Sequence, residues 1–155
     1  MSETGTDQLL LVEDSDDHAE LAEFYITDYS DRIRIDRLRD GAEAMSYLEK
    51  VEASPEQHLP WLVLLDLKLP KYDGHEILNR IKSGRRLAGV PVVVFSTSNA
   101  AKDIRQALEN YANSYIVKPM EAGRYGEVLC EILQYWELNQ HRAVLDLDTE
   151  QRRDA

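Results

Sequence analysis

Side chains with complementary chemistry stand directly after the short apolar runs of this sequence. They are three carboxylates, two hydroxyls and one ammonium: Glu13, Asp14 and Asp66, then Ser96 and Thr97, then Lys118. Three carboxylates that lie close together repel one another unless a cation is bound among them, and hard oxygen ligands suit Mg²⁺. A hydroxyl and an ammonium nearby would neutralise the oxygens of a transferring phosphoryl group, and Asp66 is the natural nucleophile for an acyl phosphate. The set therefore favours Mg²⁺-dependent phosphoryl transfer to a carboxylate.

Each of these residues alone has a plainer explanation. Acidic residues after a strand often cap the next helix, serines fit turns, and a lone lysine before proline is usually solvated. Capping does not account for Asp66, because the stretch 67–70 that follows it does not begin a helix. The joint occurrence of these residues therefore favours a functional site.

The apolar runs have the length and composition of buried strands. They are rich in Val, Leu and Ile and cover residues 9–12, 33–38, 61–65, 91–95 and 115–117. Continuous runs of this kind are typical of strands that are buried on both faces. The second run alternates with polar residues instead, which favours a position at the edge of the sheet.

Between these runs, the apolar residues return with the period of a helix. The predicted faces are Ala19, Ala22, Ile26 and Tyr29; Ala44, Met45 and Leu48; Ile77, Leu78 and Ile81; Ile104, Ala107, Leu108 and Tyr111; and residues 125–136. Asp73 and Glu76 have capping-box spacing, and Ser98 or Asn99 could cap the fourth helix. Strict alternation of strand and helix predicts an α/β fold, a doubly wound five-stranded parallel sheet. Ligands of such sheets bind at the carboxyl ends of the strands, where the candidate site residues stand.

The overall charge argues against several classes of partner. The chain has 155 residues, with 18 basic and 29 acidic side chains and a net charge of −11. Such a surface repels phosphate backbones and anionic lipids, so we expect neither a nucleic-acid nor a membrane binder. No apolar run approaches the roughly 20 residues that a spanning helix needs, and no signal peptide is visible. We therefore expect a soluble cytoplasmic protein.

Cysteine and histidine usage excludes other kinds of site. The single cysteine, Cys130, excludes an internal disulfide and a multi-cysteine zinc site. The four histidines show no ligand spacing, which argues against a transition-metal site. Along the chain we expect a disordered leader over residues 1–7, one domain over 8–138 and a C-terminal extension over 139–155.

Several stretches, in this order, resemble the motifs of the receiver domain of two-component response regulators. They are residues 10–15 (LLVEDS), 64–74 (LLDLKLPKYDG), 92–98 (VVVFSTS) and 115–119 (YIVKP). Each stretch alone is a weak signal, but together, each at the end of a predicted strand, they make a specific match. The resemblance implies a flavodoxin-like (βα)5 receiver fold with an extended C-terminus.

The resemblance also implies how the acidic residues act. Asp66 would accept a phosphoryl group from a histidine kinase. Asp14 and Asp66 would bind Mg²⁺ directly, Glu13 would do so through water, and the backbone carbonyl of Lys68 would complete the protein ligands. Glu13 replaces the Asp that is more frequent in the family.

Further roles follow from the same resemblance. Ser96 would bind the phosphoryl oxygen, with Thr97 in the small position beside it, and Lys118 would pair with the phosphate. Tyr115 matches the aromatic residue that turns inward when the hydroxyl moves. The bond before Pro119 is typically cis in the family.

The resemblance narrows to the small single-domain regulators of phytochrome-type histidine kinases. The stretch 65–71, residues 96–98 and the aromatic pair Tyr135-Trp136 carry it. In those proteins the region after the last helix is extended and contributes to a homodimer. Alternatively, the aromatic pair completes the core face of the last helix.

Other classes of protein use similar residues. A haloacid dehalogenase-type phosphatase needs a second Asp where Lys68 stands, and it has its nucleophile after the first strand. A flavodoxin-like flavin carrier needs hydroxyls and glycines where the acidic residues 13–17 would repel phosphate. A pseudo-receiver without phosphotransfer is the third alternative, and the full set of acids, hydroxyl and lysine argues against it.

The resemblance to receiver domains also implies where partners bind. We expect the signal to leave through the face of the fourth helix, fifth strand and fifth helix, because phosphorylation shifts the population of conformations there. We expect the kinase to dock near residues 18–29, with Tyr25 and Ile26 as contacts.

Overall fold

Strands and helices alternate along the chain as the apolar pattern predicts. The computed structural model describes residues 7–139. Its elements are, in chain order, β1 (Asp7–Val12), α1 (Asp16–Tyr29), β2 (Ile33–Leu38), α2 (Gly41–Ala53), β3 (Leu62–Leu65), α3 (Gly74–Lys82), the short 3-10 helix η1 (Leu87–Gly89), β4 (Val92–Ser96), α4 (Ala101–Glu109), β5 (Ser114–Val117) and α5 (Ala122–Leu138).

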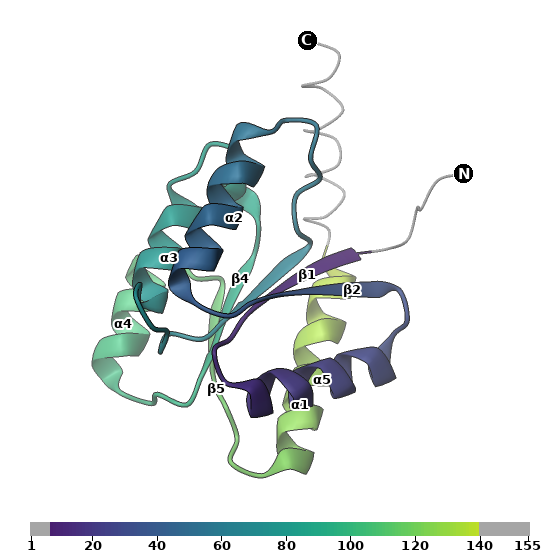
Figure 1. The fold of residues 1–155 in the computed structure, drawn as a ribbon. Coiled ribbons are helices and arrows are strands. Elements are labelled where there is room, and N and C mark those ends of the chain that lie inside the picture. The colour runs from purple at the N-terminus through teal and green to yellow at the C-terminus, as the bar shows by residue number, and fades with distance from the viewer. Residues whose placement is uncertain (1–6, 140–155) are drawn as a thin grey trace.

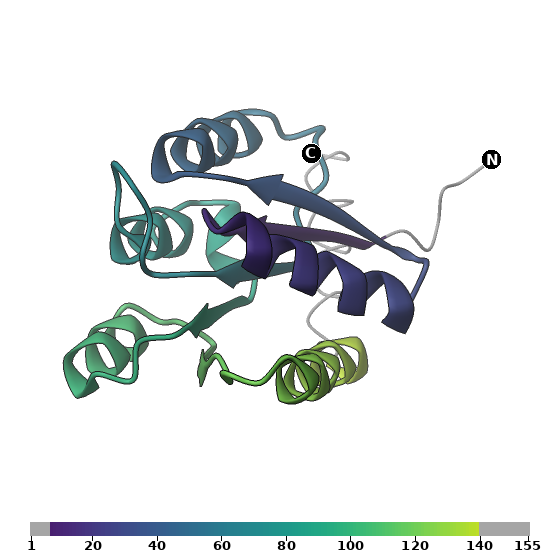
Figure 2. The same ribbon diagram turned by 60° about the horizontal axis from the view of Figure 1, so that its bottom comes forward.

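The strands form one parallel sheet in the order β2-β1-β3-β4-β5 (Figure 1). Figure 2 shows α1 and α5 on one face of the sheet and α2, α3 and α4 on the other. Each face encloses its own hydrophobic cluster, one including Ile26 and Leu129 and the other including Leu48 and Ile77. The doubly wound parallel sheet is therefore confirmed, and β2 lies at its edge as predicted.

The strand register brings the candidate site residues to one edge. Val12 at the end of β1 pairs with Leu65 at the end of β3, and Ser96 at the end of β4 pairs with Val117 at the end of β5. The chain order reverses between β1 and β3, and ligands of open α/β sheets bind at such a switch point. The residues after β1 and β3 therefore lie where binding chemistry is expected.

Side-chain caps explain where several helices begin. The Ser15 hydroxyl accepts a hydrogen bond from the His18 N–H at 3.3 Å, and Asp73 Oδ1 accepts one from the Glu76 N–H at 3.0 Å. The predicted cap of the fourth helix is wrong, because α4 has Ala100 as its N-cap and no side chain caps it. Ser98 lies two residues before that cap, and its hydroxyl instead donates to Asp103 Oδ2 at 2.6 Å.

The predicted leader is one residue too long. Asp7 already belongs to β1, because its N–H donates to the carbonyl of Arg32 at 2.9 Å. Most of the expected leader and of the C-terminal extension, residues 1–6 and 140–155, lies outside the described residues. Within residues 7–139, none of the helices has the length and apolar character needed to cross a membrane.

Candidate functional site

A buried ammonium lies between two buried carboxylates at the carboxyl edge of the sheet. Lys118 is 4% exposed, Glu13 2% and Asp66 7%. Lys118 Nζ donates to Asp66 Oδ2 at 3.0 Å and to Glu13 Oε1. Its third close neighbour is His18 Nδ1, at 2.9 Å. Each of the three N–H groups of the ammonium thus has an acceptor within reach.

Burial shapes the electrostatics of this pocket. It raises the pKa of the Glu13 carboxyl, because a buried carboxylate loses its hydration, and the Lys118 charge acts in the opposite direction. The negative charge of Asp66 raises the pKa of Glu13 further. Since one ammonium faces two carboxylates, the pocket favours binding of an additional cation.

The donor atoms of the pocket fit a divalent cation. One ligand atom each from Glu13, His18 and Asp66 lies within 4.8 Å of the others. The Lys118 ammonium in contact with all three residues shows that positive charge is stabilised at this point. Carboxylate oxygens are ligands that Mg²⁺, Mn²⁺ and Ca²⁺ accept.

The other predicted site residues lie around this centre. Asp14 is exposed, between Glu13 and the start of α1. The backbone N–H of Lys68 donates to Asp66 Oδ1 at 3.2 Å, so the loop after β3 closes over that carboxylate. Ser96 is fully buried at the end of β4, and Thr97 is exposed.

Tyr115 is tied to the loop that follows β4. Its hydroxyl donates to the carbonyl of Ser98 at 2.8 Å, and burial raises the pKa of this phenol. Asp103 Oδ2 accepts from the Ser98 hydroxyl, and Asp103 Oδ1 lies 3.3 Å from His75 Nε2. These two partners lower the pKa of the Asp103 carboxyl. No sequence pattern indicates His75 and Asp103, because their contact joins α3 to α4 across 28 positions.

The expected cis bond before Pro119 is not found. No peptide bond among residues 7–139 is cis, so the Lys118–Pro119 bond is trans. The trans form of such bonds is intrinsically favoured by about 0.5–1 kcal/mol. With a trans bond the Lys118 ammonium still reaches both Glu13 and Asp66.

His18 is a pocket residue that the histidine pattern did not reveal. Its partners lie at the ends of β1, β3 and β5, so no local spacing could indicate them. The available signal was its place in the first turn of the helix that follows β1, because that turn faces the same edge of the sheet.

Gly74 allows α3 to approach the backbone of the pocket. A Cβ at this position would lie 2.5 Å from the Cα of Leu67 and 2.6 Å from the carbonyl oxygen of Asp66. We expect Gly74→Ala to destabilise the protein by about 1–3 kcal/mol, because backbone atoms must move apart. The matched control is Gly123→Ala in α5, where the added methyl meets nothing within 4 Å and helix propensity improves. Urea denaturation of both variants measures the difference, and equal stabilities would contradict this packing.

Comparison with known proteins identifies the family. Residues 9–129 match the response regulator receiver domain family. The chain belongs to the response regulator receiver family.

Relatives of this receiver include two regulatory proteins from different organisms. It is 44% identical over 128 residues to the probable methanogenesis regulatory protein FilR2 of Methanothrix harundinacea, covering 83% of this chain and 82% of that protein. It is 34% identical over 128 residues to the response regulator Rcp1 of Synechocystis, covering 83% and 87% of the two chains.

Solved structures give the same assignment. The phosphorylated cyanobacterial phytochrome response regulator RcpA matches with a TM-score of 0.79 and 34% identity, covering 86% of this chain and 95% of RcpA. The Mn²⁺-bound form of Rcp1 matches with a TM-score of 0.76 and 33% identity, covering 84% and 94%. The receiver is thus related to phytochrome response regulators. The phosphatase and flavin-carrier alternatives do not apply.

Proposed function

We propose that this receiver accepts a phosphoryl group on Asp66 from a histidine kinase, with Mg²⁺ as cofactor, and signals through protein contacts that depend on phosphorylation. The observation that carries the proposal is the contact of the Lys118 ammonium with Asp66 in a buried acidic pocket. A buried carboxylate with a fixed cation beside it suits attack on phosphorus, because the cation also neutralises the incoming phosphoryl oxygens. The proposal includes a cytoplasmic location.

The transfer follows from the arrangement of the side chains. An oxygen of Asp66 forms a bond to phosphorus while the phosphorus–nitrogen bond of the kinase's phosphohistidine breaks, and the imidazole leaves with the electron pair. Mg²⁺, held by Glu13, Asp14, Asp66 and the backbone carbonyl of Lys68, would neutralise charge on the phosphoryl oxygens. Lys118 supplies N–H donors to the same oxygens, and the buried Ser96 hydroxyl is a further donor.

The loop after β4 gives phosphorylation a route to the surface. A phosphoryl group adds about −1.5 to −2 charges, which attracts the Lys118 ammonium and the Ser96 hydroxyl. Movement of Ser96 bears on Ser98, because the Ser98 N–H donates to Ser96 Oγ at 3.3 Å. The Ser98 carbonyl in turn accepts a hydrogen bond from the Tyr115 hydroxyl. The proposal is that phosphorylation shifts this loop and Tyr115 toward one arrangement, which alters the face formed by α4, β5 and α5.

The direct test is the intact mass of the protein after incubation with acetyl phosphate. We expect the gain of one phosphoryl group with Mg²⁺, none with EDTA, and none in Asp66→Asn. Failure of acetyl phosphate, of a second small donor and of a phosphorylated kinase would overturn the proposal and favour the pseudo-receiver alternative.

The proposal extends to a kinase of the phytochrome type and to α1 as its docking site. Rcp1 and RcpA, both about one-third identical, support the kinase class. Ile26 was expected as a contact, but it is fully buried against α5 and the sheet, so Ile26→Glu would test folding rather than docking. Phe24 is the exposed apolar side chain of α1, 65% accessible and flanked by Glu23 and Asp28.

Phe24→Ser separates docking from chemistry. We expect transfer from a phosphorylated phytochrome-type kinase to slow about tenfold, because an exposed aromatic anchor is lost. Phosphorylation by acetyl phosphate should stay unchanged, since the pocket is untouched. Equal rates from the kinase would exclude Phe24 as a contact.

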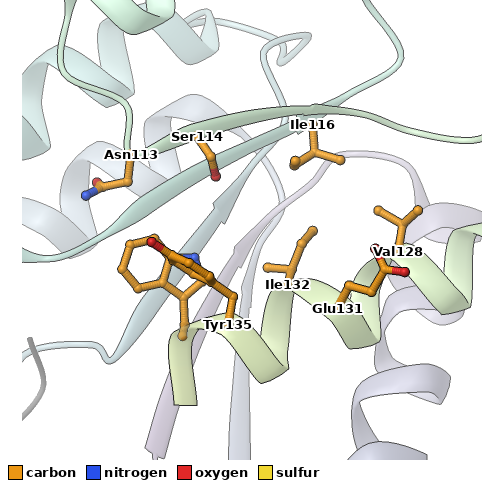
Figure 3. A pocket seen from close by; sticks show the side chains of 8 residues that line it. Asn113, Ser114, Ile116, Val128, Glu131, Ile132 and Tyr135 are labelled. Carbon is orange, nitrogen blue, oxygen red and sulfur yellow. The ribbon is translucent and has the colours of Figure 1, made fainter. Parts of the chain in front are cut away.

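The last part of the proposal is a homodimer through β5 and α5. The two aromatic residues near the end of α5 differ in exposure. Trp136 is 7% exposed and belongs to the core, whereas Tyr135 is 60% exposed. Figure 3 shows Tyr135, Ile132 and Ile116 at a pocket between β5 and α5. The volume of this pocket is about 290 Å³. Leu138, 80% exposed, continues this apolar surface toward the C-terminal extension.

Tyr135→Glu tests this interface. We expect it to raise the dimer dissociation constant by about 30-fold, as for loss of a central aromatic anchor. Gln134→Glu, the exposed neighbour on the same helix, is the matched control. Light scattering after size exclusion gives the mass of each variant. A wild-type protein that is monomeric at every concentration and phosphorylation state would exclude the dimer.

A further inference from the structure

His18 adds a nitrogen ligand atom to a pocket whose other candidate metal ligands are oxygens. We infer that His18 makes this site bind first-row transition-metal dications more tightly than Mg²⁺. The inference rests on the proposed metal-dependent function, and it concerns which cation the same pocket prefers.

The geometry places the imidazole among the metal-binding atoms. His18 Nδ1 lies 3.8 Å from Glu13 Oε1. One ligand atom each from Glu13, His18 and Asp66 lies within 4.8 Å of the other two. The same nitrogen is 2.9 Å from Lys118 Nζ. Glu13, His18 and Asp66 therefore direct their ligand atoms toward one point, which the ammonium now occupies.

The contact with Lys118 fixes the chemical form of the imidazole. An ammonium has only N–H donors, so the nitrogen that faces it at 2.9 Å presents a lone pair. His18 is thus a neutral imidazole with its proton on Nε2, which is the form that binds metals.

The local structure holds this ring and leaves a route for a cation. Ser15 caps the first turn of α1 through the His18 N–H, and the Tyr125 hydroxyl donates to the His18 carbonyl at 3.4 Å. The ring of Tyr125 also lies 6.4 Å from the imidazole, centroid to centroid. The His18 side chain is 38% exposed, whereas Glu13 is 3% exposed, so the imidazole forms the solvent side of the pocket.

The preference follows from ligand chemistry. Mg²⁺ favours oxygen ligands and keeps several waters, so an imidazole contributes little to its binding. Co²⁺, Ni²⁺ and Zn²⁺ bind imidazole well, and affinity for a given site rises from Mn²⁺ through Co²⁺ and Ni²⁺ to Cu²⁺. A histidine within reach therefore raises the affinity for these metals selectively.

Metal titrations of the unphosphorylated, untagged protein test the inference without reference to activity. After removal of metal with EDTA and desalting, Co²⁺ and Mg²⁺ are titrated separately into wild type, His18→Ala, His18→Asp and His58→Ala. We expect wild type to bind Co²⁺ at least about tenfold more tightly than Mg²⁺. His18→Ala should lower the affinity for Co²⁺ by about tenfold or more and change the affinity for Mg²⁺ less than about twofold.

The two other variants sharpen the result. His18→Asp replaces the nitrogen with a carboxylate, so the preference for Co²⁺ should fall while Mg²⁺ affinity is kept or raised. His58→Ala, at an exposed position in the α2–β3 loop, should behave as wild type. In NMR spectra of the Co²⁺ complex, strongly shifted imidazole resonances should be present in wild type and absent in His18→Ala.

The outcomes separate this inference from the proposed function. Unchanged Co²⁺ affinity in His18→Ala, or no shifted imidazole signal in wild type, would overturn the inference while Mg²⁺ binding and phosphorylation remain intact. Failure of both Mg²⁺ and Co²⁺ to bind would overturn the metal site itself, and the inference with it.

Discussion

Replacing Lys118 with methionine should destabilise the metal-free protein by about 3–5 kcal/mol, because it leaves two carboxylates buried without their cation. Glu13 and Asp66 are 2% and 7% exposed, and both contact the Lys118 ammonium. Removing one partner of a buried ion pair leaves the desolvation cost of the other uncompensated. Urea denaturation in EDTA measures the loss.

The stability lost in Lys118→Met should increase as the pH rises from about 4 toward neutral. Burial raises the pKa of Glu13 from 4.5, and Lys118 opposes that rise. Without Lys118 the pKa of folded Glu13 rises further, so the folded state binds a proton more readily than the unfolded state. The resulting stabilisation is complete below the unfolded pKa and is lost as pH rises through the folded pKa. The difference from wild type should therefore be small at about pH 4 and grow toward neutral pH.

A double variant distinguishes charge from packing. Glu13→Gln in the Lys118→Met background removes one of the uncompensated charges, so it should restore at least about 1 kcal/mol at neutral pH. A Lys118→Met protein within 1 kcal/mol of wild type, or a double variant with no recovery, would contradict the electrostatic account.

Arg86→Met should also reduce stability by about 3 kcal/mol or more, because one buried and three partly buried hydrogen bonds to carbonyls are lost at once. The Arg86 guanidinium is buried at 8% exposure and donates to the carbonyls of Ser54 at 2.8 Å, Pro55 at 3.3 Å and Gln57 at 2.7 Å. It also donates to the carbonyl of Val51. The loop between α2 and β3 is thus organised around one side chain.

Arg86→Lys is the informative companion variant. An ammonium keeps the charge but lacks the planar fork that reaches several carbonyls together, so we expect it to recover less than half of the loss. Phosphorylation of Arg86→Met by acetyl phosphate should stay normal below its unfolding transition, because the carbonyls described above, which accept from this guanidinium, belong to residues 51–57 and not to the pocket. Full stability of Arg86→Met would show that the carbonyls find other donors.

The convergence of the site could be predicted because it depends only on topology. In a parallel sheet, residues that follow the strands meet at one edge, so Glu13, Asp66 and Lys118 needed no side-chain geometry to be grouped together. The strand and helix pattern was equally readable, because the runs were short, apolar and regularly spaced.

What could not be predicted depends on side-chain direction and long-range contacts. His18 enters the pocket through the orientation of the first turn of α1, which the spacing of histidines does not report. Ile26 shares the periodic apolar face with Ala19 and Ala22, so the helix pattern already indicated the core, and its assignment to the kinase contact conflicted with that pattern. The link from Ser98 through Asp103 to His75 needs three elements in their final positions.

The most direct test of the central claim is to locate the phosphoryl group after reaction with acetyl phosphate and Mg²⁺. Borohydride reduces an aspartyl phosphate to homoserine, and peptide mass spectrometry then identifies the modified position. The account predicts homoserine at position 66 and at no other aspartate. Modification at Asp14, or an acid-labile phosphoryl group on His18 with Asp66 unmodified, would contradict it.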